Sequence, residues 1–549
     1  MLRKYHILSY LDTRKASLKK IGTFMRGYNI FKKEKKIYLF RKLKSDLIAS
    51  NHKFDLFFLK LVTYFYKDFN AIDLNLSLSQ YVIQRISTRK LNLNILMHKV
   101  LKKDIFFRLP TLYRKIINKN YNYNVSPLSS LLLWPLFCLL HWFYANYLMS
   151  KIFFKSLRNL NKKKQHSDLY FFQILDSNTP HTVNHETARN SYDLISWFEK
   201  FYTKQNIIVN KIEHDNVLIP GKLTKTLNIN YSDHPYFFIK NISSAFKFLL
   251  VSFFLSFSSF VLLLTGRWSA AFLLSEIFKA MAFLDTNKSK NSKRFLFHYS
   301  ETFYRPIWTY FSNLKNAETI LYFYSTYDAP TDYINKNIDR SYEFANISWN
   351  KILVWDEHQK NILSPFVDKN CELIVVGPIW FRDKSFVFKK NSFKLLIFDM
   401  EVQRSSLHFG WGEISEYNNH NKKLSYLFLN DIYNLFKNND IEIILKRKRQ
   451  IGDKVQTSYK NLILKLKKDS KFTVIDEDVS PQYLMENVNV VITTPFTSAN
   501  LYYSKNNLQN IYYDPIGYVN TNDPATRHIP LISGVNELEK WKKKINFNL

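Results

Sequence analysis

Residues 491–503 read VITTPFTSANLYY, an apolar segment that runs directly into hydroxyl side chains and one proline. The apolar start predicts a buried strand that ends near Ile492. Thr494 suits a helix N-cap, and Pro495 suits the first helical position, where its missing N–H would have no partner in any case. A helix beginning here would offer free backbone N–H groups, which with the hydroxyls of Thr497 and Ser498 could hold a phosphate. An ordinary capped helix start would have the same sequence.

The surrounding chain alternates short apolar runs with helical patterns from about residue 168 onward, which is typical of β-α-β units and parallel sheets. The expected strands of a first sheet are 169–174, 206–209, 319–324, 352–355 and 372–376. Those of a second sheet are 394–398, 441–445, 472–475, 489–492 and 510–513, with helices at 427–436, 481–487 and 535–544. The sequence therefore predicts an α/β fold with two Rossmann-like parallel-sheet domains, preceded by a basic, mainly helical N-terminal region.

This pattern predicts three segments. Residues 1–167 are the basic helical region, and residues 168–392 are the first Rossmann-like domain, with an apolar helical segment at 243–285. Residues 393–549 are the second Rossmann-like domain.

Ligands of parallel sheets bind beyond the carboxyl ends of the strands, so the residues that follow each expected strand are the candidates for function. In the first domain these include three acids and a histidine, namely Asp328, Asp356, Glu357 and His358. In the second they are Asp399, Glu401, Lys446, Arg447 and Asp514, together with the hydroxyls after residue 492. Acids at a helix start also serve as caps, and a basic run can be a solvated charge cluster, so both interpretations stay open.

Composition narrows the possible chemistry. Two cysteines cannot build a disulfide framework or a four-thiolate zinc site within one chain, and ten glycines include no Walker loop. No His, Asp or Glu spacing indicates a metal site, so we expect none. The net charge of +34 comes mostly from the first 300 residues. Such a charge is compatible with binding to nucleic acid or to an anionic membrane surface. Because the aromatic residues gather in apolar runs, we expect the protein to bind the membrane surface and no nucleic acid.

Two long apolar runs lie in this basic half, at residues 125–150 and 248–266. Each is long enough to span a membrane, to lie in its surface, or to be a buried core helix. The flanks of both runs are basic, which gives no charge asymmetry to support crossing. No secretory signal is evident at the start of the chain. We expect a cytoplasmic protein associated with the inner face of the cytoplasmic membrane.

A family resemblance rests on several short motifs. Residues 495–498 form the string PFTS, and its companions in order are YRPIW at 304–308, VWDEHQ at 354–359, VGP at 376–378 and HIPLISG at 528–534. Over about residues 295–545 the chain resembles the polysaccharide biosynthesis PFTS motif proteins, a group related to bacterial surface carbohydrate biosynthesis proteins.

The resemblance implies a GT-B-like arrangement, with two Rossmann-type domains facing each other, and a glycosyltransferase-like enzyme of surface polysaccharide (O-antigen or capsule) biosynthesis. Sugar would pass from a nucleotide-sugar donor to a glycan or a lipid-linked acceptor, without a metal and without any cofactor other than the donor. The implied donor-binding residues are Thr494, Pro495, Thr497, Ser498, Lys446, Arg447, Gly410, Gly412 and Asp514. The base would be Asp356, Glu357, His358 or Asp328. Alternatives are a polyol-phosphate transferase acting on a glycan and a non-enzymatic, membrane-bound assembly protein.

Overall fold

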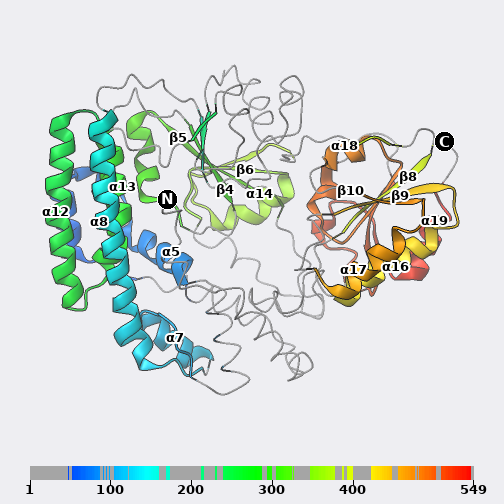
Figure 1. Ribbon diagram of the computed structural model, residues 1–549, viewed down its shortest axis with the longest axis horizontal. Helices are drawn as coiled ribbons and strands as arrows, with labels where there is room; N and C mark the ends of the chain where they lie inside the picture. Colours follow the sequence, from blue (N-terminus) through cyan, green and yellow to red (C-terminus); the bar gives the residue numbers. More distant parts are fainter. Residues whose placement is uncertain are drawn as a thin grey trace.

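The computed structural model describes a large part of the chain. The described residues are 47, 52–86, 91, 94, 98, 104–121, 123–159, 169–172, 212–214, 229–231, 239–286, 294–299, 304–323, 325–326, 347–377, 386–388, 392–399, 422–447, 455–475, 479, 481–502, 509–517 and 519–545. Within them a helical layer lies at one end of the molecule, a first sheet in the middle and a second sheet at the other end (Figure 1).

The first sheet has seven parallel strands in the order β3-β2-β1-β4-β5-β6-β7. The strands are β1 (Leu169–Phe172), β2 (Ile212–His214), β3 (Ile229–Tyr231), β4 (Arg294–Tyr299), β5 (Glu318–Phe323), β6 (Lys351–Val354) and β7 (Glu372–Val375). The first six follow the order of a Rossmann sheet, 3-2-1-4-5-6. Strands β1 to β3 add to one side of the sheet and β4 to β7 to the other, so the strand order reverses between β1 and β4. Helix α14 (Glu357–Leu363) joins β6 to β7.

The second sheet repeats that order with six parallel strands, β10-β9-β8-β11-β12-β13. The strands are β8 (Phe393–Phe398), β9 (Ile441–Lys446), β10 (Phe472–Ile475), β11 (Val490–Thr493), β12 (Gln509–Asp514) and β13 (Leu531–Ser533). The helices between and after them are α16 (Lys422–Phe436), α17 (Thr457–Leu466), α18 (Pro481–Met485) and α19 (Val535–Lys542). The α/β fold with two Rossmann-like parallel sheets is therefore confirmed.

Side chains of each second-sheet strand alternate between two cores. In β8, Leu395 and Ile397 pack with the core under α16, α17 and α19, whereas Leu396 and Phe398 pack with a smaller core on the other face. Because both faces are covered, the strands are continuous apolar runs, as expected for a parallel sheet. Burial of each such side chain contributes about 1.5–3 kcal/mol.

The helices before β1 share one core with the first sheet. They are α4 (Leu56–Phe65), α5 (Leu74–Ile86), α7 (Thr111–Tyr121) and α8 (Trp134–Asn159), and they pack with α12 (Ile242–Leu264) and α13 (Ser269–Leu284). Every side chain of α13 from Ser269 to Phe283 is buried. The Trp308 ring lies 5.0 Å from Phe283 of α13 and 4.9 Å from Phe295 of β4, so the helical layer and the first sheet are joined directly.

Most of the predicted elements are found within one or two residues of their expected ends. The expected strand at 206–209 lies outside the described residues. Strands β2, β3, β4 and β13 were not predicted. The boundaries at residues 167 and 392 remain predictions, and the shared core joins the predicted N-terminal region to the first sheet rather than setting it apart.

Candidate functional site

The segment after β11 is a turn. The N–H of Thr497 donates to the carbonyl of Thr494 at 3.2 Å, and Phe496 has the left-handed φ of 59°. A helix cannot continue through that conformation, so the predicted helix start at Thr494 and Pro495 is wrong; a 3-10 helix, η9 (Ser498–Tyr502), begins only at Ser498. The strained backbone is held because the Phe496 ring is buried beside Tyr512.

The register of the second sheet places the ends of three adjacent strands, β9, β8 and β11, in one row. Thr493 is paired with Phe398, and Phe398 is paired with Lys446. The residues that follow, Thr494, Asp399 and Arg447, therefore leave the same edge side by side. The chain reverses its direction of growth between β8 and β11, and this is the point at which open parallel sheets bind ligands.

Arg447 and Asp399 form a buried ion pair at this edge. The Nε of Arg447 donates to Oδ2 of Asp399 at 3.2 Å, and the side chains are 2% and 1% exposed. The hydroxyl of Tyr459 donates to the same oxygen at 2.7 Å. Burial and the neighbouring Asp399 carboxylate hold the pKa of Tyr459 well above its usual value, so it stays a neutral donor. The two Nη atoms of Arg447 are also buried, and no described residue accepts a hydrogen bond from them.

The turn after β11 contacts the first sheet. The Ser498 hydroxyl lies 2.6 Å from the Ser325 hydroxyl and 3.2 Å from that of Thr326, in the segment that follows β5. This segment is positioned by Gln359 of α14, whose side-chain amide donates to the carbonyls of Ser325 and Thr326 at 3.1 and 3.2 Å. The carboxyl ends of the two sheets thus meet at Ser498.

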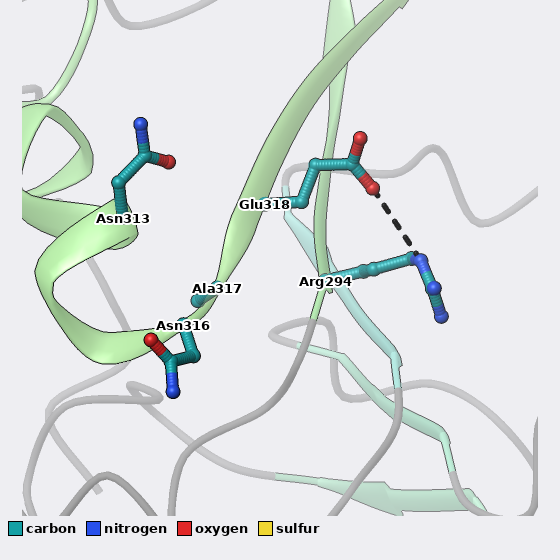
Figure 2. Close-up of a pocket in the computed structure, with 5 residues that line it drawn as sticks. All are labelled: Arg294, Asn313, Asn316, Ala317 and Glu318. Atoms are coloured by element: carbon teal, nitrogen blue, oxygen red, sulfur yellow. Dashed lines mark ion pairs between the residues drawn. The ribbon is translucent and has the colours of Figure 1, made fainter.

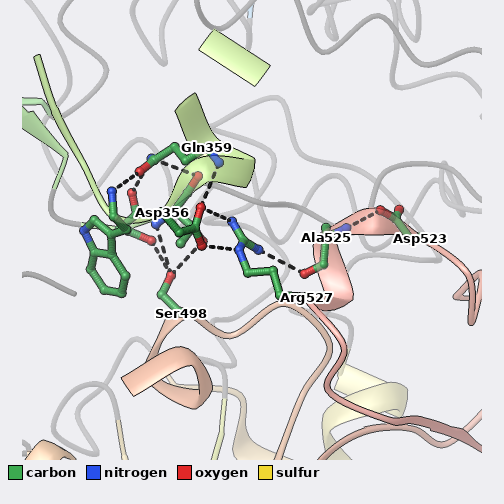
Figure 3. Close-up of polar contacts among 9 residues, drawn as sticks. Asp356, Gln359, Ser498, Asp523, Ala525 and Arg527 are labelled. Carbon is green, nitrogen blue, oxygen red and sulfur yellow. Dashed lines mark hydrogen bonds and ion pairs between the residues drawn. The ribbon is translucent and has the colours of Figure 1, made fainter. Parts of the chain in front are cut away.

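A second contact between the sheets is an ion pair. Arg527 follows the short 3-10 helix η10 (Pro524–Thr526) in a left-handed conformation, with φ of 51°. Its guanidinium donates to both carboxylate oxygens of Asp356 and, at 3.0 Å, to the carbonyl of Ala525. Asp356 is also the N-cap of α14, since its side chain accepts from the N–H of Gln359. Figure 3 shows Ser498 and Arg527 approaching α14 from the second sheet.

The other predicted site residues have varied surroundings. Lys446 is buried and donates to the carbonyl of Arg447, while both carboxylate oxygens of Asp514 accept from the backbone of its own loop. The Thr494 and Thr497 hydroxyls lie 2.8 Å apart. Glu357 is exposed and pairs with Lys360, and His358 is partly buried beside it. Asp328, Gly410 and Gly412 lie outside the described residues.

A cavity of about 410 Å³ lies elsewhere, lined by Arg294, Asn313, Asn316, Ala317 and Glu318. It adjoins the first residues of β4 and β5, at the amino ends of the strands (Figure 2). Arg294 and Glu318 form an ion pair across the two strand starts at 3.4 Å. Because parallel sheets bind ligands at the opposite edge, this cavity is not the candidate site. The described part of the chain has no group of three or more His, Cys, Asp or Glu side chains that could hold a metal.

Sequence reasoning missed three residues that complete the site. Arg527 precedes the HIPLISG motif, but nothing local indicated that it would reach Asp356. Tyr459 lies in α17, and no sequence pattern distinguished it from a core residue. Gln359 was part of the VWDEHQ motif, and its spacing three residues after an N-cap, as in a capping box, was the available signal.

Comparisons with known proteins complete this description. No curated protein matches the chain in sequence. Among solved structures, a UDP-GlcNAc 2-epimerase of Methanocaldococcus jannaschii, solved with UDP-GlcNAc and UDP, has a TM-score of 0.33 and 13% identity, covering 69% of this chain and 93% of its own. HepE of Anabaena, solved with UDP and glucose, has a TM-score of 0.31 and 6% identity, covering 68% and 89%. Similarity of this degree does not establish a shared activity.

The family comparison is more informative. The model of the family described as "Polysaccharide biosynthesis PFTS motif protein" matches residues 249–542, which is more than half of the chain. The match starts inside α12, earlier than the resemblance at 295–545, and takes in both sheet edges of the candidate site. The chain belongs to the polysaccharide biosynthesis PFTS motif protein family.

Proposed function

We propose that this protein is a glycosyltransferase of surface polysaccharide (O-antigen or capsule) biosynthesis, which moves a sugar from a nucleotide-sugar donor to a hydroxyl of a glycan or lipid-linked acceptor. The observation that carries the proposal is Arg447. Its two Nη groups are buried without a protein partner among the described residues, at the ligand-binding edge of the second sheet. Buried donors without partners are costly, and a guanidinium is well suited to binding a diphosphate.

The donor diphosphate would lie at the row formed by Thr494, Asp399 and Arg447. Asp399, which also accepts from the Tyr459 hydroxyl, holds the guanidinium in place through Nε and leaves the Nη groups for phosphate oxygens. The hydroxyls of Thr494 and Thr497 are close to one another and would supply further donors. As the bond between the anomeric carbon and the diphosphate breaks, charge grows on the departing nucleoside diphosphate, and these groups stabilise it.

The acceptor would bind on the side of the first sheet. Its hydroxyl oxygen forms the new bond to the anomeric carbon and loses its proton to a base. Asp356 is held by Arg527 and by the N–H of Gln359, so we give it a positioning role that ties the two sheets together. Glu357 and His358, at the start of the same helix, are the candidate bases.

The test is transfer by the purified full-length protein from a panel of nucleotide sugars labelled in the sugar, with a lipid-linked glycan as acceptor. Label in the product, lost in an Arg447→Met variant, supports the proposal. If the product is labelled only when the label is on the phosphate of the donor, the protein is a polyol-phosphate transferase instead. If the correctly folded protein neither binds nor turns over any donor, the result would favour the non-enzymatic assembly role instead.

Lys468→Met, at an exposed lysine in the turn between α17 and β10, serves as the matched control for loss of a positive charge and should leave transfer unchanged. The variants Glu357→Gln and His358→Asn distinguish the two candidate bases. The variant that lowers kcat without weakening donor binding identifies the base, whereas unchanged kcat in both variants would exclude this helix as its source.

A further inference from the structure

The outer side of the helical layer is apolar over three helices. On α12 the exposed residues recur at helical spacing and are Phe246, Leu250, Phe253, Phe254, Phe257, Val261 and Leu264. On α8 they are Leu136, Phe143, Tyr147 and Phe154, and on α4 they are Leu56, Phe57 and Tyr64. We call these residues the outer helical face. Ring contacts between Phe65 and Phe254, and between Phe153 and Phe246, join α4 and α8 to α12, so the face is continuous.

Helix α12 lacks the polar outer side of a helix on the surface of a water-soluble protein. Its small polar side chains are inside: Ser252 and Ser259 are fully buried, and the Ser256 hydroxyl donates to Asn146 of α8 at 2.7 Å. Large aromatic side chains face outward, with Phe253 67% and Phe257 64% exposed, while Phe248 packs inside. Small residues and polar contacts between helices, with large apolar residues facing outward, are typical of helices in lipid.

The charges on these helices match an anionic surface. α4, α8 and α12 together contain no Asp or Glu, and they carry Lys60, Lys151, Lys155, Arg158 and Lys247. Exposed basic side chains also lie at both ends of α12: Lys240 before it, and Arg267 after it, which forms an ion pair with Asp55 at 2.5 Å. Interfacial helices bury an apolar face in the headgroup region while their basic side chains contact anionic lipids.

The packing of α13 fixes the orientation. α13 is buried along its length between α8 and α12 on one side and the first sheet on the other, through Phe283, Trp308 and Phe295. If α8 and α12 crossed the bilayer, α13 and β4 would be carried into the hydrocarbon with them. A parallel β-sheet with open edges is not stable there.

We infer that the outer helical face docks the protein on an anionic phospholipid membrane, with α4, α8 and α12 lying in the plane of one leaflet and not crossing it. The two helices of the described residues that are long and apolar enough to span a membrane, Ser129–Arg158 and Ile242–Leu264, therefore act as a monotopic anchor. The inference does not depend on sugar transfer, and it places the first sheet next to the membrane surface from which a lipid-linked acceptor would be reached.

The first test is flotation of the purified full-length protein with vesicles of phosphatidylcholine alone or of equal parts phosphatidylcholine and phosphatidylglycerol. We expect the protein to float with the mixed vesicles, and a Phe253→Gln/Phe257→Gln variant to bind at least about tenfold less, because two exposed aromatic anchors are lost. Leu464→Gln/Val535→Gln, at exposed apolar positions of helices α17 and α19, is the matched control and should float like the wild type.

Equal flotation of both variants and wild type would overturn the inference. So would a Phe253→Gln/Phe257→Gln variant that keeps vesicle binding but loses self-association in sedimentation, because the face would then be an interface with a second copy. Melting temperatures close to the wild type confirm that the variants are folded; these exposed positions do not contribute to the core.

The second test measures orientation in cells. Single cysteines at Ser243 and Thr265, near the two ends of α12, are introduced after Cys138→Ala and Cys371→Ala, and intact cells are treated with a membrane-impermeant maleimide. In-plane docking predicts that neither site is labelled in intact cells and that both are labelled after lysis. Labelling of one site alone in intact cells shows a spanning helix and contradicts the inference.

Discussion

The buried pair of Arg447 and Asp399 allows a prediction in which the magnitude follows from the structure. The charges are 3.2 Å apart and both side chains are almost fully buried. At an effective dielectric constant of about 20, their attraction is about 5 kcal/mol. Removal of one partner leaves a buried charge without its counter-ion, so Asp399→Asn should destabilise the second sheet by about 3–5 kcal/mol. Tyr459→Phe removes only a hydrogen bond to a charged acceptor and should cost about 1.5–3 kcal/mol.

The combined variant Asp399→Leu/Arg447→Met/Tyr459→Phe removes both charges of the ion pair and the tyrosine hydroxyl that donates to it. Because apolar side chains of similar size can replace a buried ion pair, it should lie within about 1 kcal/mol of the wild type, yet bind no nucleotide sugar. Hydrogen exchange at the amides of β8 and β9 measures the local stability without requiring the whole molecule to unfold in one step. A loss below about 1 kcal/mol in Asp399→Asn, or a combined variant less stable than the single one, would refute the reasoning.

Three further predictions concern other parts of the described chain. Burial lowers the pKa of His52 to about 4, so the unfolded chain binds more protons than the folded chain below pH 6.5. The free energy of unfolding should therefore fall by about 3 kcal/mol as the pH drops from about 6.5 to 4. In urea unfolding of the His52→Phe variant this part of the pH dependence should be absent. Burial, then Asp368, raises the pKa of Cys371 to about 11, so its alkylation rate, followed by mass spectrometry, should still rise above pH 9; a plateau at 9 contradicts this. Arg527→Ala and Asp356→Asn should each cost about 1–2 kcal/mol and be strongly non-additive in a double-mutant cycle of urea unfolding; additive losses would show that the pair does not couple the sheets.

Local patterns were sufficient to predict most of the second sheet. Strands β8, β9 and β11 are buried on both faces and appear as continuous apolar runs, and the amphipathic pattern of α16 and α19 marks the helices that cover them. Strand β4, Arg294–Tyr299, was missed because it is flanked by charged residues and follows the long apolar helices α12 and α13. Strand β13 was missed because it has only three residues, directly after Pro530.

The candidate site was predicted only in part, because local patterns do not determine contacts between distant segments. That Thr494, Asp399 and Arg447 leave one edge follows from parallel strand order, and the sequence pattern indicated it. The left-handed Phe496 depends on burial against Tyr512, a contact from another strand, and so the turn was mistaken for a helix start. The contacts of Ser498 and Arg527 with the first sheet depend on how two separate sheets face each other, which no local pattern determines.

The most direct test of the proposed donor site is the footprint of a nucleotide on the protein. Hydrogen exchange is measured with and without UDP, GDP, CDP and dTDP, on the wild type and on the combined variant at Asp399, Arg447 and Tyr459. The account predicts that at least one nucleotide slows exchange at the carboxyl ends of β8, β9 and β11 in the wild type, and that this protection is absent from the variant. Protection confined to the cavity at Arg294 and Glu318, or none with any nucleotide, would contradict it.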